Sequence, residues 1–199
     1  MRESYRLRTL YLLNALFFAL CSTQLLSQEP ANDSTNESPR PSTQVDGRHD
    51  FDWDIGTWTT HQRRLLHPLT GSTQWVEYRG TDTVHKMWDG ANRGEIRATG
   101  QAGSLELFTL RLYNPQTHEW SIYFTNSTTG VLSTPVVGTF KNGHGEFFDQ
   151  EQYNGKTILL RFSVTKITSD ECRFEQAFSP DGGRTWETNF IVTETLSKG

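Results

Sequence analysis

The chain has 199 residues, of which 34% are hydrophobic and 21% are charged, a composition that fits one domain with a modest core. Its 19 basic and 23 acidic side chains leave a formal net charge of -4, so it lacks the positive charge needed to neutralise phosphates. We therefore expect no nucleic-acid partner.

The first residues are typical of an export signal. Three arginines within residues 2–8 precede the apolar segment 10–20, which is too short to cross a bilayer comfortably as a mature helix. We predict a signal peptide over residues 1–27, cleaved between residues 21 and 28, and hence a periplasmic or extracellular protein. Two alternatives stay open: the segment is retained as a membrane anchor, or Cys21 carries a lipid, although the leucine before it is large for such a signal. No membrane contact is expected apart from this segment.

A polar segment separates the signal from the domain. Residues 28–48 contain one aliphatic side chain larger than alanine, so they cannot bury enough apolar surface to offset their chain entropy. We predict a disordered linker there and a folded domain over residues 49–199. After cleavage Cys172 is the one remaining cysteine, which excludes an intramolecular disulfide and favours a buried, inert thiol.

From residue 49 onward, apolar and polar residues alternate in segments bounded by Gly, Pro, Asn or Asp, the pattern of half-buried strands. Asn-Gly pairs at 142–143 and 154–155 predict tight hairpin turns. The expected strands cover residues 57–66, 73–84, 93–98, 105–113, 120–125, 131–140, 146–153, 157–167, 172–178 and 185–195.

These strands follow one another through short turns, and no segment has a convincing helical period. A meander of about ten strands has two exposed edges, and closure into a barrel removes them. We therefore predict an all-β, antiparallel, up-and-down barrel in preference to a two-sheet sandwich. A barrel of this size is wide enough to hold one small ligand.

The start of the domain is similar to a known superfamily. Gly56-Thr57-Trp58 resembles the Gly-x-Trp on the first strand of calycins, which include lipocalins, fatty-acid-binding proteins and nitrobindins. The resemblance implies a calycin-like barrel whose tryptophan plugs the closed end. Residues 49–58, 109–115, 120–123 and 182–189 also resemble an exported bacterial family, over almost all of residues 49–195, and this likeness implies no particular activity.

The histidines argue against a haem or metal cofactor. Nitrobindins bind haem iron through a histidine near the C-terminal end of the barrel, whereas the last histidine here is His144. His61, His67, His85 and His118 lack the i, i+2 or i, i+4 spacing that places two imidazoles on one metal. We expect neither cofactor nor metal.

Residues 179–186 resemble the Asp-box of sialidase-type propellers, Ser-x-Asp-x-Gly-x-Thr-Trp. Propellers repeat this motif once per blade, whereas this chain has one copy. We expect a structural hairpin turn here and no sialidase activity.

Polar and aromatic residues in the middle of strands are candidates for lining the lumen. An inward arginine needs a carboxylate partner, so we expect Arg111 to pair with Glu175 or Glu187, although an outward, solvated position is equally open for each candidate. The candidate ligand-binding residues are Arg63, Trp75, Glu77, Arg111, Tyr123, Arg161, Glu175, Trp186 and Asn189.

The sequence thus favours an exported barrel that holds a small amphipathic or hydrophobic molecule in its lumen. One alternative is an enzyme that uses lumen carboxylates, but the chain has no Gly-x-Ser-x-Gly, His-Glu-x-x-His or glycine-rich phosphate loop. Another is a cell-surface module that meets a protein or glycan through exposed aromatics such as Trp53 and Trp88. The oligomeric state is left open.

Overall fold

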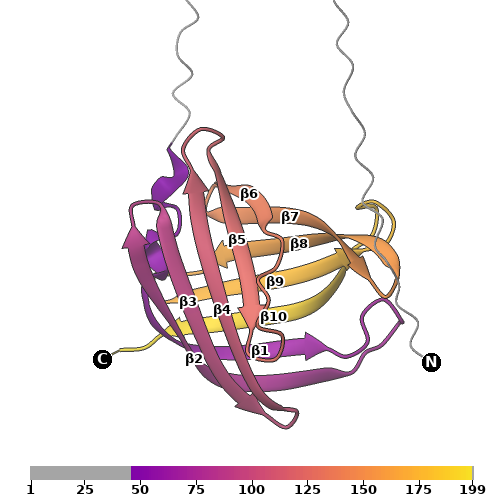
Figure 1. Ribbon diagram of the computed structural model, residues 1–199. Helices are drawn as coiled ribbons and strands as arrows, with labels where there is room; N and C mark the ends of the chain where they lie inside the picture. The colour runs from indigo at the N-terminus through magenta and orange to yellow at the C-terminus, as the bar shows by residue number, and fades with distance from the viewer. Residues whose placement is uncertain (1–45, 199) are drawn as a thin grey trace, which may run out of the picture. The chain divides into compact units, whose positions relative to one another are not determined.

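The computed structural model describes residues 46–198, which form ten antiparallel strands closed into a barrel (Figure 1). Every strand pairs with its neighbours in sequence, and β1 also pairs with β10, which closes the sheet. This confirms the predicted all-β up-and-down barrel. Two short 3-10 segments, η1 (Gly47–His49) and η2 (Asp52–Asp54), precede the strands. The strands are β1 (Gly56–Leu65), β2 (Trp75–Trp88), β3 (Ala91–Gly100), β4 (Gly103–Asn114), β5 (Glu119–Asn126), β6 (Val136–Lys141), β7 (His144–Tyr153), β8 (Lys156–Lys166), β9 (Glu171–Ser179) and β10 (Glu187–Leu196).

The alternation of side chains decides which residues face the interior. In β8, Ile158, Leu160, Phe162 and Val164 are all buried, whereas the residues between them are partly exposed. The predicted hairpin turns also form, and Asn142 and Asn154 adopt φ angles of 53° and 50° that asparagine tolerates well. The barrel interior is therefore lined mainly by apolar side chains.

Several strand boundaries differ from the predicted ones. β2 and β3 run up to a tight turn at Asp89 and Gly90, where a longer turn was expected. β6 begins at Val136, because residues 127–135 form a loop in which the Asn126 side chain accepts hydrogen bonds from two backbone N–H groups, at 3.0 and 2.9 Å. β10 begins at Glu187, because the preceding residues belong to the Asp-box turn.

The Asp-box residues form the structural turn expected from the sequence. Asp181 accepts hydrogen bonds from the Thr185 backbone N–H at 2.9 Å and from the Thr185 hydroxyl at 2.7 Å. These bonds, led by the backbone one, lower the pKa of Asp181 to about 2. Trp186 donates its indole N–H to the Gly183 carbonyl at 3.1 Å, which completes the turn.

Aromatic side chains close one end of the barrel. Trp58 and Phe51 are fully buried there, and Phe51 packs edge-on against Trp120 with ring centroids 5.0 Å apart. The Trp58 indole donates to the Asp54 carbonyl at 2.8 Å, and the Trp120 indole donates to the Gly47 carbonyl at 2.9 Å. The indigo segment before β1 thus packs into this end of the barrel (Figure 1). We call Phe51, Trp58, Trp120 and Phe147 the aromatic plug.

The predicted signal peptide lies outside the described residues, as does the predicted linker apart from residues 46–48. Those last residues join the barrel, because the Gly47 backbone N–H donates to the Tyr113 hydroxyl at 3.1 Å. Within residues 46–198 no helix has the length and apolar character needed to cross a membrane.

Candidate ligand-binding cavity

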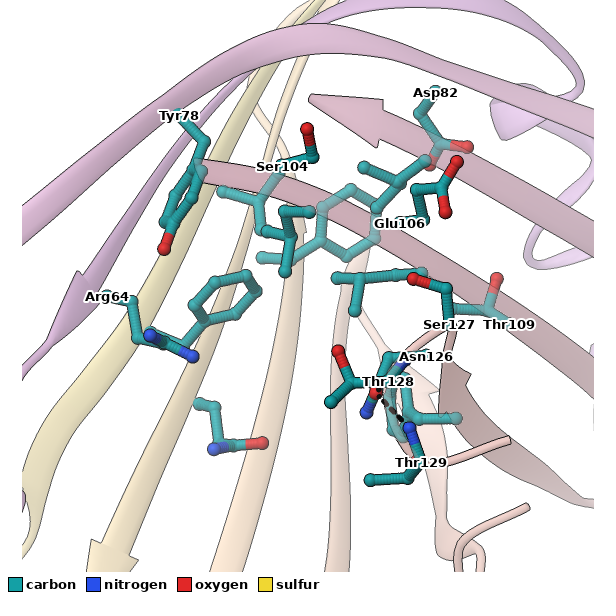
Figure 2. Close-up of a pocket in the computed structure, with 18 of the residues that line it drawn as sticks. Arg64, Tyr78, Asp82, Ser104, Glu106, Thr109, Asn126, Ser127, Thr128 and Thr129 are labelled. Carbon is teal, nitrogen blue, oxygen red and sulfur yellow. Dashed lines mark hydrogen bonds between the residues drawn. The ribbon is translucent and has the colours of Figure 1, made fainter. Parts of the chain in front are cut away.

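A cavity of about 500 Å³ occupies the barrel between the aromatic plug and the opposite end (Figure 2). Inward-facing apolar side chains from β2, β3, β4, β5, β8, β9 and β10 form its walls. Polar residues at its rim come from β1, from β4 (Ser104 and Glu106) and from the loop after β5, and Figure 2 shows Arg64 across the cavity from Asp82. The wall residues include Tyr78, Ile96, Leu105, Leu107, Phe124, Phe162, Phe174, Phe190 and Val192.

The cavity ends on a charged layer. Asp82 of β2, Thr109 and Arg111 of β4, and Glu194 of β10 line it on the side of the plug, and we call these four residues the floor. Arg111 reaches below the floor, where its guanidinium forms an ion pair with Asp54 and donates to the Asn92 side-chain oxygen at 3.2 Å. The charged layer is therefore tied to η2, the segment that directly follows Phe51 of the plug.

The Arg111 guanidinium also stacks on the plug. It lies 4.7 Å from the centroid of the Phe51 ring, a cation-π contact inside the protein. Arg111 is only 3% exposed. On the plug side it thus contacts Asp54, Asn92 and Phe51, and on the cavity side it lies 5.7 Å from the centroid of the Phe174 ring.

The charged layer carries more acidic than basic groups. Asp54, Asp82 and Glu194 are each at most 2% exposed, and Arg111 is the one buried cation among residues 46–198. Burial raises the pKa of Asp82 to about 6, against the opposing effect of Arg111, and nearby Asp54 adds to the rise. Burial and the neighbouring Asp82 likewise raise the pKa of Glu194. Ionising all three carboxyls would leave excess negative charge in a medium of low polarity.

Several polar atoms of the floor have no protein partner. They are the Arg111 Nε and three oxygens, Asp82 Oδ1, Glu194 Oε1 and Thr109 Oγ1. Gly94 on β3 leaves room for them, since a Cβ atom at this position would lie 2.7 Å from Thr109 Oγ1 and 3.3 Å from Asp82 Oδ1. The floor therefore presents unsatisfied oxygens to whatever enters the cavity.

Cys172 is buried beside the floor, as the sequence predicted. Its thiol donates to Glu194 Oε2 at 3.8 Å, and burial together with the adjacent carboxyls raises its pKa, so the thiol stays protonated and unreactive. The potential ligand atoms of Asp54, Cys172 and Glu194 lie within 4.8 Å of one another. A metal ion there would have to compete with Arg111 for Asp54 and would require the unfavourable thiolate.

The structure places the predicted site residues in two groups. Arg111 lies on the cavity floor, and Asn189 is buried at the rim, in a smaller cavity of about 380 Å³ that shares Arg64, Gln176 and Phe190 with the main one. Asn189 accepts a hydrogen bond from the Gln176 side chain at 2.9 Å. The other seven, Arg63, Trp75, Glu77, Tyr123, Arg161, Glu175 and Trp186, do not line the main cavity.

Outer-face contacts explain the position of most of those seven. Arg63 lies 3.7 Å from Glu77 and stacks 5.0 Å from the centroid of Trp75. The Arg161 guanidinium likewise stacks 4.6 Å from the centroid of Trp186. Their strands turn the apolar set inward, so these mid-strand polar residues face outward, where charges remain hydrated.

The expected partner of Arg111 was wrong. Glu175 accepts from Arg173 at 2.9 Å, and Glu187 accepts from the Leu69 backbone N–H at 2.6 Å, whereas Arg111 pairs with Asp54. Asp54 lies in the segment before the first strand. The position of this segment cannot be predicted from strand periodicity in the sequence.

Sequence reasoning missed Asp82 and Glu194 as site residues. Both have a readable signal, because Asp82 shares a face with Tyr78 and Val84, and Glu194 shares one with Val192. An acidic residue in the apolar register of a strand points into the core, where it needs a partner.

Solved structures share this barrel at low sequence identity. The S-type phycobiliprotein lyase CPES from Guillardia theta is 11% identical, with a TM-score of 0.53 over 78% of this chain and 95% of that one. Rv2717c from M. tuberculosis is 9% identical, with a TM-score of 0.51 over 75% and 98%. A de novo designed fluorescence-activating β-barrel is 13% identical, with a TM-score of 0.41 over 77% and 99%. No family model and no curated protein matches the chain. These likenesses concern the fold alone.

Proposed function

We propose that this protein is an exported barrel that binds one small amphipathic or hydrophobic molecule in its lumen. The observation that carries the proposal is the cavity of about 500 Å³, whose walls are apolar and whose floor is polar. Its size lies within the range of about 300–1,000 Å³ that is typical of small-molecule sites, and a few convergent polar groups in an apolar pocket are typical of such sites as well.

Assignment to the calycin superfamily is part of the same proposal. Trp58 of the Gly-x-Trp motif is fully buried in the aromatic plug, the position that the resemblance implies for it. The barrel is also shared with a phycobiliprotein lyase. The buried Trp58 supports a barrel that is closed at one end, and the shared structure supports the barrel fold itself.

Export is supported by the arginines within residues 2–8 and the apolar segment 10–20 that follows them. The test is N-terminal sequencing of the protein recovered from its own cells. We expect it to begin between residues 21 and 28. Recovery from the cytoplasm of a chain that still begins at Met1 would refute export.

Binding is tested first by native mass spectrometry of the protein purified from its own host. We expect a small molecule to co-purify in a ratio of one to one. The same protein, freed of that molecule, is then titrated with N-phenylnaphthylamine, a neutral fluorophore that brightens in apolar surroundings. Bare polypeptide in the first measurement and no saturable fluorescence in the second would refute the proposal.

A matched pair of variants on β4 locates the binding site. Leu107 lines the cavity, and Leu110 lies on the opposite face of the same strand. Leu107→Trp fills part of the cavity and is expected to weaken fluorophore binding roughly tenfold or more, since the added ring excludes the ligand. Leu110→Trp is expected to bind as the parent protein does. Equal binding by both variants would place the fluorophore outside the lumen.

A further inference from the structure

The floor of the cavity carries acidic side chains in apolar surroundings, and some of their oxygens have no hydrogen-bond partner. Asp82 and Glu194 are each 2% exposed, and each has one carboxyl oxygen without a protein partner. Both line the cavity directly. A carboxylate in such a place is stabilised only by a proton or by a cation that arrives from outside.

No side chain among the described residues donates to these two oxygens, and Arg111 offsets only part of the negative charge of the two carboxyls. Arg111 is the one buried cation of the described chain, and its guanidinium is engaged by Asp54 and Asn92 on the plug side of the floor. Arg64, the other arginine that lines the cavity, is exposed at the rim. It lies four residues along β1 from Thr60, the residue that pairs with Glu194, a span of roughly 13 Å along a strand.

Any further positive charge for these carboxyls has to enter through the cavity, because both line it directly. The walls between rim and floor are mainly phenylalanine and aliphatic side chains, among them Phe162, Phe174 and Leu107, and they also include Tyr78 and Gln176. A group that reaches the floor has to be attached to an apolar body that these walls accept. Small hydrated cations gain nothing from the walls, and neutral hydrocarbons gain nothing from the floor.

We propose that the ligand is an amphipathic organic cation whose protonated amine donates hydrogen bonds to Asp82 and Glu194 while its apolar body packs against the phenylalanine walls. The inference rests on the proposed function, because it names the chemical class of the molecule that the lumen holds. An ammonium group offers three donors, which suits two carboxylates and the Thr109 hydroxyl, the third unpartnered oxygen of the floor.

The experiment compares ligands of equal apolar body. Decylamine, decanol and decanoate compete with N-phenylnaphthylamine for the parent protein at about pH 8, above the pKa of about 6 to which burial raises Asp82. We expect decylamine to bind roughly tenfold or more tightly than decanol, since it forms charge-assisted hydrogen bonds. Binding by all three with no preference for the amine would overturn the inference but leave the proposed function standing. No binding by any of them, nor by the fluorophore, would overturn both.

Isosteric amide variants assign the preference to the floor. Asp82→Asn and Glu194→Gln keep the shape of the side chains and remove the charge, and we expect each to lose most of the preference for decylamine while binding decanol as before. Glu175→Gln is the matched control, because Glu175 pairs with Arg173 outside the cavity. We expect that variant to retain the parent's preference. Retention of the preference in both floor variants would overturn the inference.

The pH dependence gives a second readout. Asp82 faces Arg111, Asp54 and Glu194, and Glu194 faces Cys172 as well. A bound ammonium favours the ionised carboxyls, so raising the pH from about 5 to about 8 should tighten decylamine binding and leave decanol binding nearly unchanged. Equal pH dependence for the two ligands would contradict the proposal. Saturable Zn²⁺ binding that disappears in Cys172→Ser and blocks decylamine would also overturn it, in favour of a metal site.

Discussion

Replacing Asp82 with asparagine should stabilise the ligand-free protein, and the gain should depend on pH. Burial raises the pKa of Asp82 from 3.8 to about 6 in the folded protein. The folded state therefore holds the Asp82 proton more tightly than the unfolded chain does. As the pH rises from about 4 to about 6, the unfolded chain gives up this proton first, and the free energy of unfolding falls.

The size of the effect follows from the two pKa values of Asp82. Their difference of about 2 corresponds to about 3 kcal/mol, at 1.36 kcal/mol for each tenfold change in proton affinity. Asp82→Asn removes this cost above about pH 6 and changes little below about pH 4, where the parent carboxyl is protonated in both states. For a domain of this size, about 3 kcal/mol raises the Tm by roughly 6–12 °C.

The assay is urea denaturation of the parent protein and the variant at about pH 4 and about pH 8, followed by tryptophan fluorescence. Asp170→Asn serves as the control, because Asp170 is partly exposed and its nearest cation, Lys198, lies 4.0 Å away. We expect the control to show nearly the same small change at both pH values. A gain for Asp82→Asn that is equal at the two pH values, or a loss at about pH 8, would refute the charge balance described for the floor.

The remaining predictions concern the packing that holds the floor and the plug in place. Arg111→Met should lower the free energy of unfolding by about 3–5 kcal/mol, because it leaves Asp54 buried without its counter-charge. Adding Asp54→Asn to this variant should recover most of the loss in urea denaturation. Purely additive losses for the two substitutions would contradict the ion pair. Phe51→Ala should cost about 3–5 kcal/mol through the cavity left in the plug, measured in the same way, and a loss below about 1 kcal/mol would show that the ring contributes little to the closed end. Gly138→Ala should cost about 2 kcal/mol or more, because its Cβ would lie 1.9 Å from the Glu146 carbonyl oxygen; an unchanged urea midpoint would show that β6 and β7 separate without cost.

The fold was predictable because strand periodicity is a local property. Alternation such as that of Ile158, Leu160, Phe162 and Val164 shows both the strand and its buried face. The Asn-Gly turns at 142–143 and 154–155 identify hairpins in the same local way. The boundaries of β6 and β10 were harder to predict, because the hydrogen bonds of side chains such as Asn126 decide where those strands begin.

The binding residues were less predictable because their roles depend on which face of a strand points inward. Choosing polar residues in mid-strand selected Arg63 and Arg161, whose charges are hydrated or stacked on tryptophan at the outer face. Choosing the polar residues that share a strand face with the buried apolar residues would have selected Asp82 and Glu194 instead. Arg111, which was among the predicted residues, does line the cavity, but its partner lies in a short 3-10 segment that has no periodic signal.

The amino-acid sequence alone determined that this chain forms a succession of antiparallel strands with one apolar face, because each strand and turn depends on neighbours in the sequence. Only the tertiary structure decided which charges meet. Closure of β1 onto β10 brings Glu194 into the layer that holds Asp82, Arg111 and Asp54, contributed by distant parts of the chain. Burial then changes the electrostatics of these groups. Carboxyls that would have their usual pKa values in water must share one guanidinium in an apolar interior.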